Sequence, residues 1–150
     1  MAAYARIAVA RSAGGWTVAG NNANLTAIAT FAAMAGGAGG TVTHFGVGRA
    51  SSGAGELLFF GTVTPNLAIV AGVTPKLDTG TVVSQTTPDG MANSAATDLL
   101  KLLFNNTTWA SLGDGTGLLG SGTAGSLYLS LHTSTPGEAG DQTTNEIAYT

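Results

Sequence analysis

Two histidines are the residues best suited to acid–base chemistry or metal binding in this chain. His44 lies in the run Thr-His-Phe-Gly, and His132 ends a run of alternating apolar residues. A metal site would need a third ligand, and the candidates Glu138, Asp141 and Glu146 lie in or beyond a turn with no recognisable ligand spacing. The sequence therefore predicts structural histidines that are hydrogen-bonded to the backbone, and no bound metal.

The serines and carboxylates offer no catalytic arrangement. No serine lies in a GxSxG elbow, and no acid is placed to orient either histidine. The carboxylates are few and mostly in turns, so they do not form the pair that glycoside hydrolysis requires. We predict no catalytic residue and a protein that is not an enzyme.

A glycine-rich loop gives a formal dinucleotide-binding match at Gly120, Gly122 and Gly125. A Rossmann loop opens a helix whose amino end holds pyrophosphate, whereas residues 126–132 alternate as a strand does. The run 36–40 lacks the Lys-Ser/Thr pair of a phosphate loop and indicates a long turn. No cofactor is expected.

Composition excludes several classes of partner. The 150 residues include no cysteine, only 9% are charged, and the net charge is -3. Five scattered basic residues argue against nucleic-acid binding. No apolar run reaches the roughly 18 residues that span a bilayer, and the start lacks a secretion signal. We expect one soluble domain, residues 1–150, made in the host cytoplasm, with a neutral surface suited to packing against protein.

Short alternating runs separated by glycine-rich turns predict a mainly β chain, an antiparallel sandwich or jelly roll with one helix packed on it. Pro65 and Pro75 are expected between strands, where a missing amide donor does no harm. The expected strands are residues 4–10, 16–19, 25–31, 41–47, 57–63, 67–70, 81–84 and 127–132.

One amphipathic helix is expected over residues 94–104. Ser94 would cap its first turn, with Asp98 near the positive end of the dipole, and the helix should fray after Phe104. Trp16 and Trp109 are expected in the core. The inward arc would comprise Ala95, Ala96, Leu99, Leu102 and Leu103.

The order of the chain looks rotated. Met91, followed by small and capping residues and a helix, is how a domain commonly begins, and the turn-type stretch 86–90 precedes it. Residues 145–150 followed by residues 3–10 would read as one continuous passage. Two interpretations stay open from the residues alone: a circular permutation, or an ordinary internal methionine.

Residues 127–150 resemble a family of small tailed-bacteriophage virion proteins, often described as phage tail or capsid-stabilising proteins. The resemblance lies in His132, the Pro-Gly-Glu-Ala-Gly run 136–140 and the Glu-Ile-Ala-Tyr run 146–149. In that family these elements run directly into a segment like residues 4–11. The resemblance implies the order 91–150 followed by 3–87, with residues 88–90 as the junction, and so favours permutation.

The resemblance implies a virion structural role. Our main expectation is a capsid decoration (cement) protein on the capsid surface, bound to the phage major capsid protein and, by analogy with such proteins, a homotrimer. Its helix would pack on its own sandwich, leaving strand faces and glycine-rich loops for contacts. The alternative is a phage tail or tail-fibre component that binds the host surface.

Overall fold

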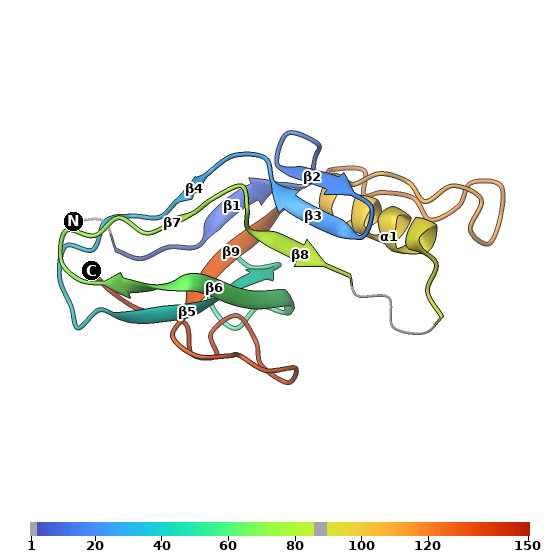
Figure 1. Ribbon diagram of the computed structural model, residues 1–150. Coiled ribbons are helices and arrows are strands. Elements are labelled where there is room, and N and C mark those ends of the chain that lie inside the picture. The colour runs from blue at the N-terminus through green and yellow to red at the C-terminus, as the bar shows by residue number, and fades with distance from the viewer. Residues whose placement is uncertain (1–2, 86–89) are drawn as a thin grey trace. The chain divides into compact units, whose positions relative to one another are not determined.

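The computed structural model describes residues 3–85 and 90–150, and it confirms a mainly β chain with antiparallel sheets and one helix (Figure 1). The chain divides into two compact units. Unit 1 comprises residues 1–8, 28–77 and 127–150, and unit 2 comprises residues 9–27 and 78–126. Within the described residues, no helix is long and apolar enough to cross a membrane.

A four-stranded sheet supplies most of unit 1. Its order is β1 (Ile7–Ala10), β9 (Ser126–His132), β5 (Gly40–Gly48) and β6 (Leu57–Ile69). The pairings of β5 with β6 and with β9 are antiparallel, and the short strands β4 (Ala29–Thr30) and β7 (Lys76–Leu77) pair separately. The buried side chains of this sheet include Val42, Phe45, Val47, Ile69, Leu129 and Leu131.

Unit 2 is a three-stranded antiparallel sheet with the helix against it. The strands are β2 (Trp16–Ala19), β3 (Asn22–Leu25) and β8 (Val82–Ser84), in the order β2-β3-β8. Helix α1 (Asn93–Asn105) contacts β2 and β3. The rings of Trp16 and Phe104 meet edge to face, with centroids 4.7 Å apart. As predicted, the helix packs on a sheet and Trp16 is fully buried.

Three details of the helix differ from the expectation. The N-cap is Ala92, without a side-chain cap, so Ser94 lies inside the first turn; that turn holds no acidic residue, so Asp98 lies beyond it. The buried stripe is Ala96, Leu100 and Phe104, a four-residue spacing that shares only Ala96 with the expected arc. Fraying near Phe104 is confirmed within one residue, because Asn106 ends the helix in the left-handed conformation.

Several predicted strand boundaries were wrong. The expected strand 25–31 is two strands, because the amide of Thr26 donates to Gly15 while that of Phe31 donates to Pro75. The expected strands 57–63 and 67–70 are one strand, β6, which runs through Pro65. Pro65 is tolerated because it lies on an edge strand between Thr62 and Leu67, where the register with β5 shifts. The other predicted strands are present, although β1 begins at Ile7 and so omits residues 4–6 of the expected strand 4–10. Residues 22–24 of β3 and the whole of β7 were missed.

The segment after the helix carries the remaining differences. Trp109 is half-buried rather than in the core, and it pairs with Leu118 through two backbone hydrogen bonds. The glycine-rich loop leads into β9, as expected. Of the predicted turn 86–90, which holds the junction 88–90, residues 86–89 lie outside the described residues.

Candidate functional site

A buried ion pair in unit 1 joins the two ends of the chain. Arg6 donates from Nε to Glu146 Oε1 and from Nη2 to Glu146 Oε2, both at 2.7 Å, and the Arg6 side chain is only 2% exposed. The hydrogen bond with Glu146 raises the pKa of the Arg6 guanidinium. A bidentate geometry of this kind fixes both position and orientation.

Arg6 also holds a loop of the sheet. Its Nη1 donates to the carbonyl of Ala50 at 3.0 Å, and its Nη2 donates to that of Gly53 at 2.9 Å. The fully buried Gln142 accepts from the Ala50 amide at 2.8 Å and donates to the Ala50 carbonyl at 3.2 Å. Loop 49–56 is therefore bound from both ends of the chain.

Tyr4 extends the network. Its hydroxyl donates to Glu146 Oε1 and accepts from the Leu131 amide, both at 2.9 Å. Burial, followed by the negative charge of Glu146, raises the pKa of Tyr4 far above its ordinary value. The Tyr4 amide also donates to the Tyr149 carbonyl at 3.0 Å, so the two ends lie side by side.

A second buried group surrounds His132. Its Nδ1 lies 2.8 Å from the Thr144 carbonyl and its Nε2 lies 2.8 Å from Ser130 Oγ. Since a carbonyl only accepts, Nδ1 carries the proton and Nε2 accepts from the serine hydroxyl. Burial lowers the pKa of His132, which keeps the ring neutral. The backbone hydrogen bond predicted for the histidines is thus present at His132.

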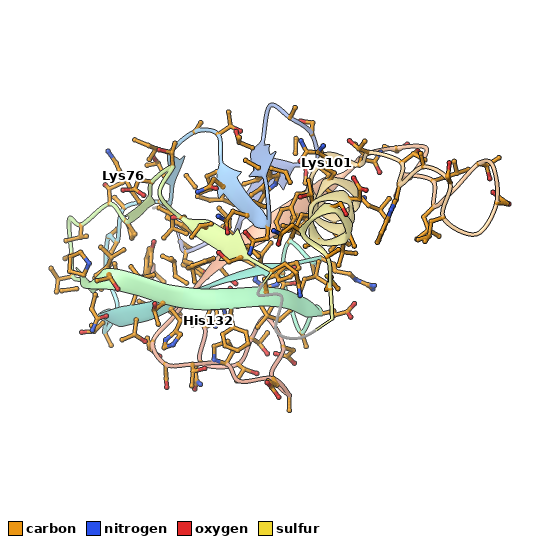
Figure 2. All side chains as sticks on the ribbon, turned by 45° about the vertical axis from the view of Figure 1, so that its right-hand side comes forward. Lys76, Lys101 and His132 are labelled. Atoms are coloured by element: carbon orange, nitrogen blue, oxygen red, sulfur yellow. The ribbon has the colours of Figure 1, made fainter. Side chains whose placement is uncertain are left out.

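The Ser130–His132 pair has the contacts of a nucleophile and a base, but no access. Both residues are 0% exposed, and a Cβ on Gly46 would lie 2.6 Å from Ser130 Oγ and 2.7 Å from His132 Nε2. Figure 2 labels His132 among the packed side chains of the sheet. The pair therefore serves to lock β9 to the segment that follows it, since a substrate has no path to the serine.

Three of the residues weighed as metal ligands, His44, His132 and Glu146, are neighbours in the fold, but each has another partner. His44 lies opposite His132 on β5, but its Nδ1 contacts the Thr43 hydroxyl at 2.8 Å. Glu146 is ion-paired with Arg6. Asp141 caps a turn, and its hydrogen bond from the Thr143 hydroxyl lowers the pKa of the Asp141 carboxyl. Across the part of the chain that the structure describes, no three His, Asp or Glu residues group as metal ligands do.

The exposed surface of unit 2 includes an ordered apolar loop. Leu112, Leu118 and Leu119 are 41%, 47% and 67% exposed. Asp114 closes the tip of this loop, accepting from the Thr116 hydroxyl and from backbone amides. Its Thr116 hydrogen bond lowers the pKa of the Asp114 carboxyl. Three leucines are therefore presented on a pre-ordered turn.

Sequence reasoning missed the network around Arg6 and Gln142. The only trace of these buried contacts in the sequence is indirect, because glycines interrupt strand β5 at positions 46 and 48. A side chain at Gly46 would collide with Ser130 and His132, and one at Gly48 would overlap Gln142. Glycine inside a strand often marks such a close approach, but its partner cannot be identified without the fold.

Comparison with known proteins gave one family. A family model described as podophage GP4 fiber I protein gp80 matches residues 1–85, more than half of the chain. No curated protein and no solved structure matched the chain.

Proposed function

The chain belongs to the podophage GP4 fiber I protein gp80 family, and from this premise we propose that it is a non-enzymatic fibre subunit that contacts the host surface. The observation that carries the proposal is the family match over residues 1–85. Membership makes the protein a phage virion structural protein. It supports the tail-fibre alternative better than capsid decoration.

The geometry fits a structural role. Ser130 and His132, which have the contacts of a nucleophile and a base, are both 0% exposed and hydrogen-bonded to their surroundings. Such groups hold segments together rather than act on a substrate. The expected trimer was drawn from decoration proteins, so it stays a prediction that the fibre family does not itself support.

The leucine loop is the surface we propose for host contact. An exposed apolar group on an ordered turn loses little conformational freedom when it binds. Asp114 is the only charged residue of the sequence between Trp109 and Gly125. Removing water from the loop on binding therefore costs the desolvation of few charged groups.

Competition for host adsorption tests the proposal. Purified chain added before phage should reduce the number of adsorbed virions, while chain unfolded by heat should not. Leu119→Ser, at a side chain 67% exposed, should weaken the competition, whereas the matched control Ile28→Ser, 57% exposed and outside the loop, should leave it unchanged.

Antibody-gold labelling of virions locates the protein independently. Gold on fibres supports the proposal. Gold on heads, together with an increase in head thermal stability when the chain is added, would replace the fibre role with the capsid-decoration role.

A further inference from the structure

Arg11, directly after strand β1, joins the end of helix α1 to the far arm of the leucine loop. Its Nε donates to the carbonyl of Leu103 at 2.6 Å, and its Nη2 donates to that of Leu102 at 2.8 Å. Its Nη1 donates to the carbonyl of Ala124 at 3.1 Å and to Ser121 Oγ at 3.3 Å. All of these residues belong to unit 2, so one guanidinium ties the start of the segment between α1 and β9 to its end.

The end of α1 needs a cation with several donors. The last four carbonyls of a helix have no partner within it, and they carry the negative end of its dipole. The last turn of α1 contains no basic residue of its own. A guanidinium spreads five N–H donors over a planar fork, whereas a lysine ammonium places its three donors on one nitrogen. Only arginine can therefore bind the helix carbonyls and the loop at the same time.

Asn106 holds the same arm of the loop as Arg11. Its Nδ2 donates to the Ser121 carbonyl at 2.8 Å, and its Oδ1 accepts from the Ser121 amide at 2.7 Å. A Cβ on Gly120 would lie 2.3 Å from the Asn106 carbonyl oxygen, so the two arms of the loop meet closely here. Ser121 is thus fixed by two side chains, two residues beyond the exposed Leu119.

Above this base the loop depends on few contacts. Among the described residues, its only β pairing is the bridge between Trp109 and Leu118. Ser111 has a φ of 60°, in the left-handed region that residues other than glycine rarely adopt, and it directly precedes the exposed Leu112. Such a conformation persists only where its surroundings hold it. The arrangement of the leucines therefore depends on the base.

We propose that Arg11 is the positioning residue of the leucine loop, and that it holds Leu112, Leu118 and Leu119 in the arrangement that binds the host. This inference rests on the host contact proposed above. A loop fixed in its binding arrangement loses little freedom on contact. A loop that adopts this arrangement about one tenth of the time binds about tenfold more weakly. Arg11 thus sets the affinity through the leucines.

Arg11→Lys tests the fork while keeping the charge. Amide exchange should become about tenfold faster at Ser121 and Leu118, whose amides donate to Asn106 Oδ1 and to the Trp109 carbonyl. Exchange in β2 and β3 should stay unchanged, because Arg11 holds the loop and not the sheet. This measurement uses no host cell, so it is independent of the proposed function.

The competition assay gives the functional measurement. Arg11→Lys should require about tenfold more chain than the wild type for the same reduction in adsorbed virions. The matched control Arg49→Gln, at a side chain 69% exposed in unit 1, should behave as the wild type in both assays.

A double variant separates positioning from a general loss of stability. If Arg11 acts through the leucines, Arg11→Lys should add little to the loss that Leu119→Ser already causes. A general loss of stability would instead weaken competition by the same factor in both backgrounds.

The outcomes separate this inference from the proposed function. Faster loop exchange, weakened competition and an unchanged circular dichroism spectrum support it. Unchanged loop exchange, unfolding of Arg11→Lys, full competition by Arg11→Lys, or equal factors in the two backgrounds overturns it and leaves host contact by the loop in place. A wild-type chain that does not compete, or a Leu119→Ser chain that competes fully, removes the host contact itself and overturns this inference with it.

Discussion

Removing the charge of Glu146 should destabilise the protein far more than the same change at Glu56. Glu146→Gln keeps the shape but leaves Arg6, with a side chain 2% exposed, without its counter-ion. The substitution also replaces one carboxylate oxygen, Oε1 or Oε2, by an NH₂ group, which donates instead of accepting. This NH₂ group then faces an N–H donor of Arg6. Breaking a buried pair in this way costs about 3–5 kcal/mol.

Glu56 offers the matched control. It pairs with Arg49 at 3.1 Å, but these side chains are 59% and 69% exposed. Exposed pairs contribute about 0–1 kcal/mol, so Glu56→Gln should change little. At about 2–4 °C per kcal/mol for a chain of this size, Glu146→Gln should lower Tm by roughly 6–20 °C and Glu56→Gln by at most about 4 °C.

The assay should follow unit 1. All three tyrosines lie in unit 1 and both tryptophans in unit 2, so tyrosine near-UV circular dichroism reports on the ion pair's own unit and tryptophan fluorescence on the other. Denaturant titrations of the two variants would give the free energies of unfolding. Equal losses, within about 1 kcal/mol, would refute the role assigned to the buried pair.

Three further outcomes are expected. Because the pKa of His132 is lowered in the folded state, the unfolded chain binds more protons below pH 6.5. The free energy of unfolding should therefore decrease as the pH is lowered through this range, by up to about 1.4 kcal/mol per pH unit. His132→Gln should flatten this slope in denaturant titrations, and an unchanged slope would contradict the assignment. Trp16 Nε1 is buried without a hydrogen-bond partner among the described residues, so Trp16→Phe loses no hydrogen bond and should cost less than Trp16→Ala, which should cost about 3–5 kcal/mol by thermal unfolding; equal costs would contradict this. Tyr4 and Tyr149 are hydrogen-bonded through their backbones, so a chain running from Met91 to Thr150 and on through residues 3–87 should give the wild-type circular dichroism spectrum, and an unfolded product would count against permutation.

Local pattern was enough to predict much of this fold. Short apolar or alternating runs between glycine-rich turns located Trp16–Ala19 and the strands that became β5 and β9, because such runs favour strands whatever they pair with. The same local reasoning predicted the helix and a backbone hydrogen bond for His132. It also predicted that the glycine-rich loop would precede a strand.

Long-range partners were decided only by the tertiary structure. Arg6 and Glu146 are 140 positions apart, and nothing in either local sequence shows that they meet. Pro65 was expected between two strands, and its place on an edge strand where the register with β5 shifts permits the strand to continue. The helix buried the stripe through Leu100, because β2 and β3 set the contact face. Local sequence determines which residues can form a strand or helix, whereas the partner of each buried polar group depends on which distant segments fold against it.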